Sequence, residues 1–274
     1  MNLKLDSAKG LIALNNSTAA EILVLIHPIG GSIICYIKLA KLLEPYMQVF
    51  AISSPGFSND DLNFFTIAEL ANKYINYYTE WSSPYVTLGG WSFGGLVAYE
   101  MARQLLFEHQ QINHLLLIDS YAYDDLEKKG GLLHKFITNL LQIRIDAECI
   151  EAIAKSVPES KLVEAVYSHL VNVSAMEDNI DLEQFKKLYD IYHQNCLAYS
   201  QYKIVSQEQI SVKMIRPYNK LSYCHCNPNA VWKLALTDNF TCHYLPGDHY
   251  NIILWPDKLS HLIVKLLIED KICH

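Results

Sequence analysis

The strongest constraint on the fold is an alternation of short β-rich runs and helical stretches between Glu21 and Asp119. Four apolar runs have the length of buried strands, and each of the first three is followed by a helical pattern. Alternation of this kind predicts an α/β fold with a largely parallel sheet, whose strands are buried on both faces. The expected strands are residues 22–26, 49–53, 85–88 and 115–118, and the expected helices are residues 34–43, 66–81 and 94–106.

The pattern changes after this block. Between residues 122 and 204 apolar side chains recur at helical steps, most clearly from Leu182 to Tyr199. Strand-like runs resume at 212–215 and 241–245, and a closing helix is expected at about 256–269. We therefore predict a single α/β domain over residues 1–274, in which residues 122–204 form a helical lid insertion above the carboxyl edge of the sheet, where α/β proteins bind ligands.

Composition excludes several classes of protein. Apolar residues make up 51% of the chain, enough for a large core, and the formal net charge of −7 offers no basic surface for nucleic acid. No apolar run approaches the roughly 20 residues that span a bilayer, and the N-terminus lacks the pattern of a secretion signal. The seven scattered cysteines are typical of reduced thiols. These features predict a cytoplasmic protein with no membrane span.

The segment from Gly90 to Gly94, Gly-Trp-Ser-Phe-Gly, fits the G-x-S-x-G pattern between an expected strand and an expected helix. In that setting the pattern is typical of a sharp turn that exposes a nucleophilic serine, here Ser92. The start of the helix adds unpaired amides and a positive dipole end near the hydroxyl. A glycine-rich turn that serves only close packing is the alternative.

A serine nucleophile needs amides that bind the oxyanion it creates. The N–H of Phe93, directly after the serine, is the first candidate, and the second is expected in the loop after an earlier strand. That loop is His27-Pro-Ile-Gly-Gly-Ser32, and we assign the donor to Ile29, with Gly30 as the alternative. We expect His27 to make a structural hydrogen bond rather than to act as a base.

The base is expected among eleven histidines. In folds with this elbow the chain order is serine, acid, histidine, and the histidine follows the last strand. His249 lies in the loop 246–250 after the last strand-like run, so we assign it the role of general base. The others have simpler explanations: His243 in a strand pattern, His225 between two cysteines, and His261 and His274 on the surface.

The acid that orients this histidine is assigned by exclusion. Residues 211–237 contain no Asp or Glu, so the loop after the strand 212–215 has none to offer. Asp119 ends the strand that follows the nucleophile helix, and it is our candidate. Asp124 and Asp125 are alternatives farther along the loop, and Asp248 is expected to shape the loop beside His249.

Four segments together carry a family resemblance: residues 25–32, 89–103, 116–121 and 246–249. They resemble the thioesterase domains that end nonribosomal peptide synthetases and related polyketide synthases, which implies the α/β-hydrolase fold. The resemblance covers about residue 11 to the C-terminus, is weak across the helical block, and agrees with Asp119 as the acid. Trp91 before the serine and the run 117–120 are more like the integrated terminal type than the proofreading type. No carrier or adenylation sequence precedes Met1, so we expect an excised domain or a free-standing member.

The resemblance also implies a reaction. Ser92, deprotonated by His249, would attack the thioester of an acyl or peptidyl chain on a carrier protein's phosphopantetheine arm. Water, or a nucleophile within the chain, would then release it as an acid or a macrocycle. No metal or cofactor would be bound by this chain, because the phosphopantetheine belongs to the carrier. The alternatives are a carboxylesterase or lipase acting on free esters, and a non-catalytic carrier-binding protein on the same fold.

Three further positions are expected to border the acyl group: Gly30, Trp91 and Tyr36, although ordinary burial explains Tyr36 equally well. The tyrosines of the helical block suit either a substrate tunnel or helix packing. The run Cys224-His225-Cys226 lacks a second ligand pair and is weak evidence for a metal site.

Overall fold

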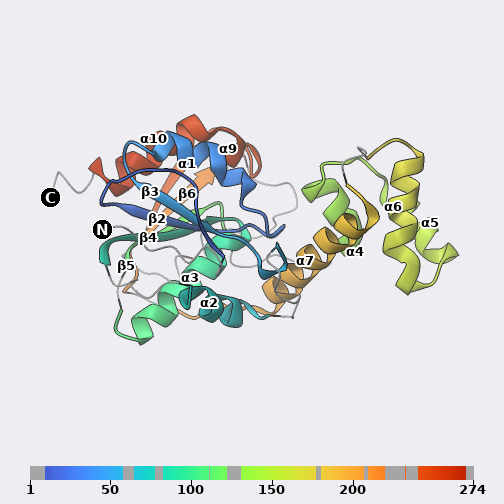
Figure 1. Cartoon of the computed structure of the whole chain (residues 1–274), viewed down its shortest axis with the longest axis horizontal. Coiled ribbons are helices and arrows are strands. Elements are labelled where there is room, and N and C mark those ends of the chain that lie inside the picture. The colour runs from blue at the N-terminus through green and yellow to red at the C-terminus, as the bar shows by residue number, and fades with distance from the viewer. Residues whose placement is uncertain are drawn as a thin grey trace.

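The computed structural model describes residues 10–57, 65–77, 83–110, 112–121, 131–176, 180–206, 209–219, 232 and 240–269. Their strands form one seven-stranded sheet in the order β1-β3-β2-β4-β5-β6-β7, parallel except for β1, which pairs antiparallel with β3 (Figure 1). The mostly parallel sheet confirms the predicted fold class. The strands are β1 (Leu11–Ala13), β2 (Ile22–Ile26), β3 (Gln48–Ile52), β4 (Ser83–Trp91), β5 (Ile112–Ile118), β6 (Val212–Pro217) and β7 (Phe240–Leu245).

Alternate side chains of the central strands enter two different hydrophobic cores, one on each face of the sheet. In β2, Leu23 and Leu25 face one core, whereas Val24 and Ile26 face the other. All five residues of β2 are buried. Burial on both faces is the reason that these strands are nearly continuous apolar runs in the sequence.

Helices cover both faces (Figure 1). A short 3-10 turn, η2 (Ile34–Tyr36), leads into α1 (Ile37–Leu43), which packs beside α10 (Pro256–Leu267) on one face. On the other face α2 (Ile67–Ile75) packs against α3 (Phe93–Phe107). The two remaining short elements here are η3 (Pro55–Phe57) and α9 (Asn251–Leu254).

The expected end of one helix is wrong, and one strand was not predicted. Helix α2 begins after Thr66, which caps it together with Glu69, but it ends at Ile75 instead of continuing to residue 81. Asn76 follows the helix, and its side chain bonds the carbonyl of Asn72 in the last turn. Strand β1 was not expected, because three residues at a sheet edge are too short to show a periodicity.

Between β5 and β6 the described chain is helical. It contains α4 (Gly131–Lys135), a π-helical turn η4 (Phe136–Leu140), α5 (Ala147–Ser156), η5 (Glu159–Lys161), α6 (Leu162–Asn172) and α7 (Leu182–Gln201). We call these elements the helical lobe; Figure 1 shows it beside the sheet domain, joined to it by α7. The lid bounds of 122–204 stay a prediction, since residues 122–130 lie outside the described part.

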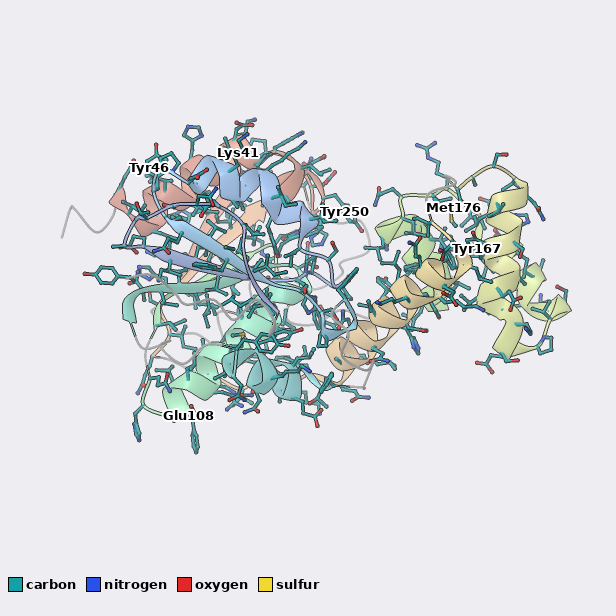
Figure 2. The ribbon with its side chains drawn as sticks, viewed as in Figure 1. Lys41, Tyr46, Glu108, Tyr167, Met176 and Tyr250 are labelled. Carbon is teal, nitrogen blue, oxygen red and sulfur yellow. The ribbon has the colours of Figure 1, made fainter. Side chains whose placement is uncertain are left out.

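The helical lobe has a hydrophobic core of its own. Phe136, Phe185 and Tyr192 are buried there, and the ring of Phe136 contacts the other two, at centroid distances of 5.3 Å to Phe185 and 5.6 Å to Tyr192. Tyr167 and Met176 pack against the same cluster (Figure 2). Helix packing therefore accounts for these tyrosines. None of the described helices is both long and apolar enough to cross a membrane.

The sheet register brings the functional loops to one edge. Ile26 of β2 pairs with Gly90 of β4, and Trp91 at the end of β4 pairs with Ile118 of β5. Ile118 in turn pairs with Ile215 of β6. Because the strands are parallel, the loops that follow β2, β4 and β5 leave from the same carboxyl edge.

Candidate active site

Ser92 is the single residue between β4 and α3, and its backbone conformation is strained. Its φ of 57° and ψ of −122° lie in a region that residues other than glycine rarely occupy. Its amide donates to the carbonyl of Ile118, 2.9 Å away, which fixes the turn to the end of β5. The half-buried serine is therefore held at the carboxyl edge, at the N-terminus of α3, as the motif predicts.

The two glycines of the motif are required by close backbone approach. A Cβ on Gly94 would lie 2.2 Å from the carbonyl oxygen of Ile26, and one on Gly90 would lie 2.4 Å from the carbonyl carbon of Gly94. Neither neighbour is a side chain that can move aside. The glycines thus let α3 pass directly against β2 and β4, which gives the turn at Ser92 its sharpness.

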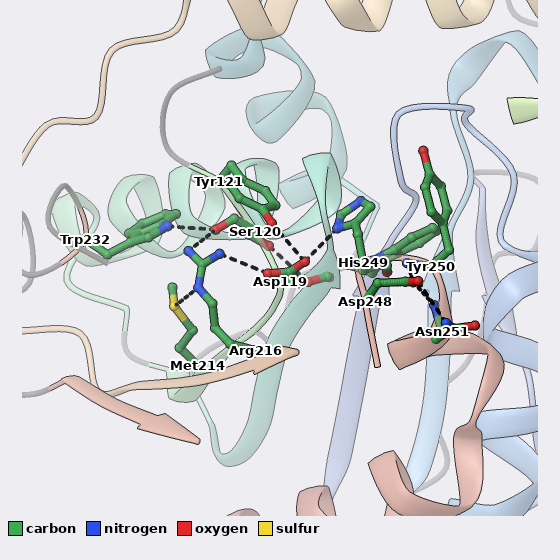
Figure 3. A network of polar contacts seen from close by, with 12 residues as sticks. Asp119, Ser120, Tyr121, Met214, Arg216, Trp232, Asp248, His249, Tyr250 and Asn251 are labelled. Atoms are coloured by element: carbon green, nitrogen blue, oxygen red, sulfur yellow. Dashed lines mark hydrogen bonds and ion pairs between the residues drawn. The ribbon is translucent and has the colours of Figure 1, made fainter. Parts of the chain in front are cut away.

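The structure brings the predicted acid and base into contact. Nδ1 of His249 donates to Oδ2 of Asp119 at 2.7 Å, and both residues are buried (Figure 3). The Tyr121 hydroxyl donates to the same carboxylate oxygen at 3.2 Å. A bond to Nδ1 leaves Nε2 as the nitrogen that can accept a proton. Asp119 also has a positive φ of 42°, so the chain turns sharply as it leaves β5.

Trp91 connects the serine turn with the histidine loop. Its indole N–H donates to the carbonyl of His249 at 3.0 Å, and the two rings lie 5.0 Å apart between centroids. Ser92 is the next residue in the chain. Within the described part of the chain no hydrogen bond joins the Ser92 hydroxyl to His249, although Trp91, the residue before Ser92, contacts His249 directly.

The loop after β2 is organised by His27, which is fully buried. Its Nδ1 lies 2.8 Å from the carbonyl oxygen of Pro28, and because a carbonyl only accepts, Nδ1 carries the proton. Its Nε2 accepts from the hydroxyl of Tyr74 at 2.7 Å. Burial lowers the pKa of His27 to about 4, against the weaker effect of the Pro28 bond. His27 is therefore neutral, and its hydrogen bonds give it a structural role in this loop rather than the role of a base.

These contacts fix the direction of the expected oxyanion donor. The Pro28 carbonyl, held by His27 and by the amide of Gly31 at 2.8 Å, belongs to the same peptide plane as the Ile29 N–H. Within the described chain, the amides of Ile29 and Phe93 have no hydrogen-bond partner. Both amides therefore remain free to bind an anion.

Two residues at the site were missed by the sequence reasoning. Asn195 of α7 donates from Nδ2 to the carbonyl of Ile29 at 2.8 Å, and Arg216 of β6 donates to Oδ1 of Asp119 at 2.9 Å. Asn195 sits on a long helix among other polar residues, where no pattern marks it. Arg216 is a charged residue at the end of an apolar strand, and that was a signal: a buried arginine requires an anionic partner.

The residues expected to border the acyl group divide in two. Tyr36 is completely buried, and its hydroxyl donates to the Ile26 carbonyl at 2.8 Å and accepts from the Trp91 amide at 2.9 Å. It lies behind the site and supports both loops. Trp91 is half-buried beside His249. Gly30 is buried under the helical lobe, where a Cβ would meet a methyl group of Leu140 at 2.4 Å.

The described residues contain no cluster of three or more His, Cys, Asp or Glu suited to a metal ion. The run Cys224-His225-Cys226 lies outside the described residues, as do Asp124, Asp125 and His274.

The parallel sheet, the strained serine turn after β4 and the histidine loop after β7 define an α/β-hydrolase fold. A family model described as Thioesterase domain matches residues 21–267, and the chain belongs to this family. Non-reducing polyketide synthase PKS16 of Cladonia grayi is 36% identical over 93 residues, which are 33% of this chain and 4% of that protein. The probable non-canonical nonribosomal peptide synthetase CymA of Salinispora arenicola is 25% identical over 260 residues, 91% of this chain and 3% of that protein. The chain thus spans only a small share of these relatives.

Solved structures agree with this assignment. The four-domain nonribosomal peptide synthetase holo-AB3403, bound to AMP and glycine, superposes with a TM-score of 0.80 and 26% identity, over 94% of this chain and 20% of that one. The NocB thioesterase domain, in covalent complex with a fluorophosphonate nocardicin G analog, has a TM-score of 0.65 and 25% identity, over 94% of this chain and 99% of that one. The resemblance to the thioesterase domains of nonribosomal peptide synthetases and polyketide synthases is therefore confirmed.

Proposed function

We propose that this protein is a serine thioesterase that releases an acyl or peptidyl chain from a carrier protein through an acyl-Ser92 intermediate. One observation carries the proposal: the strained Ser92 turn lies between β4 and α3, and the buried His249–Asp119 pair lies at the end of the adjacent strand. A hydroxyl, an imidazole and a carboxylate at one sheet edge are the parts that acyl transfer needs.

The first half of the reaction forms the acyl-enzyme. His249 Nε2 takes the proton of the Ser92 hydroxyl as its oxygen attacks the thioester carbonyl carbon, and Asp119 stabilises the imidazolium through Nδ1. Collapse of the tetrahedral intermediate breaks the carbon–sulfur bond, and the imidazolium returns the proton to the leaving thiolate. The hydroxyl and imidazole, which are not yet bonded, come into hydrogen-bond contact when substrate binds, as is common in such pairs.

The free amides of Ile29 and Phe93 bind the oxyanion of each tetrahedral intermediate. A donor of this kind contributes about 3 kcal/mol to the transition state. In the second half, His249 removes a proton from water, or from an amine or hydroxyl of the acyl chain. That nucleophile attacks the ester carbon, the bond between this carbon and the Ser92 oxygen breaks, and His249 returns its proton to Ser92 as the acid or macrocycle leaves.

The carrier-linked substrate is supported by the family and by the kind of relatives found. The similar proteins are polyketide synthases and nonribosomal peptide synthetases, of which this chain matches a small part. In this proposal the phosphopantetheine arm is supplied by the carrier protein, and the chain itself holds no cofactor.

A comparison of substrates tests the proposal. Turnover should be far faster with an acyl-pantetheine or acyl-carrier thioester than with the p-nitrophenyl ester of the same acyl group. Strong preference for the simple ester would replace the proposal with a carboxylesterase. Absence of turnover of both, together with absence of fluorophosphonate labelling, would instead favour a non-catalytic protein on this fold.

A further inference from the structure

The carboxylate of Asp119 has a second charged partner besides His249. Arg216, at the end of β6, donates from NH1 to Oδ1 of Asp119 at 2.9 Å, while His249 occupies Oδ2 (Figure 3). The side chain of Asp119 is completely buried, and that of Arg216 is 5% exposed. The two oxygens of the carboxylate are thus divided between a permanent cation and the candidate base.

This division solves an electrostatic problem. A carboxylate without contact with water needs a counter-charge. His249 has to be neutral before the reaction in order to accept the serine proton, so it does not supply that charge in the resting enzyme. The guanidinium of Arg216 supplies a positive charge that does not depend on His249. It balances Asp119 throughout and leaves the imidazole free to start neutral.

The guanidinium is fixed along its whole length. Its Nε lies 3.3 Å from the sulfur of Met214, its NH2 donates to the Ser120 carbonyl at 3.2 Å, and its Cζ lies 4.8 Å from the Tyr121 ring centroid. The indole of the buried Trp232 donates to the same Ser120 carbonyl at 2.9 Å. Because the planar guanidinium of Arg216 is held by several contacts, it fixes the rotation of the Asp119 carboxylate. The carboxylate oxygen that accepts from His249 Nδ1 is thereby kept in place.

We propose that Arg216 is a positioning residue, which balances the charge of the buried Asp119 carboxylate and holds it in the orientation in which it accepts from His249 Nδ1. The inference rests on the proposed function, because it assigns Arg216 a part in that same proton transfer. The residue acts through Asp119 and has no contact with the reacting atoms.

The rate constant for fluorophosphonate labelling of Ser92, followed by intact-protein mass spectrometry, tests this role together with kcat and KM for an acyl-pantetheine thioester. Arg216→Met should lower the labelling rate and kcat about 10- to 100-fold, by analogy with the partners that orient the side-chain ligands of a metal site. KM should change little. Arg216→Lys, which keeps the charge but loses the fork, should recover part of the rate. Lys213→Met, on the same strand, is the matched control and should behave as wild type.

The decisive comparison is made in the Asp119→Asn background. If Arg216 acts through the carboxylate, adding Arg216→Met to Asp119→Asn causes less than about a twofold further loss. Losses that multiply, or a folded Arg216→Met variant with wild-type kcat, would overturn the inference. Thermal unfolding of each variant identifies a protein that is merely unfolded, and in that case the Arg216→Lys comparison decides. If wild type itself is not labelled, the proposed function fails, and the failure is distinct from that of Arg216.

Discussion

The side-chain amide of Asn195 donates to the main-chain carbonyl of Ile29 at 2.8 Å, across 166 positions of sequence. Asn195 is buried on α7 of the helical lobe, whereas Ile29 belongs to the loop after β2. Leu140 and Ile191 of the lobe also lie against Gly30 and Gly31 of that loop. The lobe therefore holds the loop that presents the expected oxyanion donor, in addition to any part it has in covering a substrate.

Asn195→Ala should lower kcat about 10-fold with little change in KM, because a hydrogen bond worth about 1–1.5 kcal/mol no longer orients the loop. Steady-state kinetics with an acyl-pantetheine thioester measure the effect. Ser200→Ala, an exposed change on the same helix, is the control and should leave kcat unchanged. A rise in KM alone would show that Asn195 contributes to substrate binding instead of to the loop.

His27 makes the stability of the protein depend on pH. Burial lowers its pKa to about 4 in the folded state, against 6.5 for an ordinary histidine, so the unfolded chain takes up a proton first as the pH falls. The contribution of neutral His27 to the free energy of unfolding is fully present above pH 6.5 and is lost as the pH falls toward 4. Between pH 7 and 5 the wild type should lose about 2 kcal/mol more than His27→Asn. Urea unfolding at both pH values measures this, and equal losses in the two proteins would refute it.

Gly94→Ala should destabilise the protein by about 3 kcal/mol or more. The new methyl group would lie 2.2 Å from the carbonyl oxygen of Ile26, and this neighbour belongs to the backbone of β2, which has no freedom to move aside. Gly131→Ala is the comparison: its φ is 66°, but nothing lies within 4 Å of the added atom. It should cost only about 1 kcal/mol. Urea unfolding of both variants gives the difference, and similar costs would mean that α3 is not packed this closely on β2.

Tyr202, just after α7, ties the end of the helical lobe to the nucleophile helix. Its hydroxyl donates to the buried carboxylate of Glu100 on α3 at 2.9 Å. Burial raises the pKa of Glu100, but hydrogen bonds from Arg103, Gln104 and Tyr202 outweigh it and leave that pKa below its usual value.

Tyr202→Phe should therefore destabilise the fold by about 1.5–3 kcal/mol, since a charged buried acceptor loses a donor. Tyr46→Phe, at an exposed position, should stay within about 0.5 kcal/mol of wild type. Thermal and urea unfolding measure both. A loss no larger for Tyr202→Phe than for Tyr46→Phe would show that Glu100 is satisfied without it.

The sheet was predictable because strands such as β2 and β5 are buried on both faces and appear as short apolar runs, with helical patterns between them. Ser92 was predicted from its motif, Asp119 by exclusion and His249 from strand order. Ser92 and Asp119 directly follow β4 and β5, and His249 lies in the loop after β7. Their catalytic roles stay predictions that the structure makes geometrically reasonable. Edge strand β1 and the end of α2 depend on single pairings and caps, which carry little periodic signal.

The supporting contacts were not predictable in the same way. Arg216 and Asn195 act over sequence separations of 97 and 166 positions, and the partner of each is set by tertiary packing. A buried arginine at the end of β6 signals the need for an anion but does not name it. The role of Tyr36, between Ile26 and Trp91, likewise depends on the register of β2 and β4.

The most direct test of the account is to trap the covalent intermediate. The Asp119→Asn variant, slow to deacylate, is mixed with an acyl-pantetheine thioester and its peptides are mapped by tandem mass spectrometry. We predict the mass of the acyl group on Ser92, no adduct in a Ser92→Ala Asp119→Asn variant, and loss of thioester turnover in Ser92→Ala alone. An unmodified Ser92, together with full thioester turnover by Ser92→Ala, would contradict the proposal that this serine carries the acyl chain.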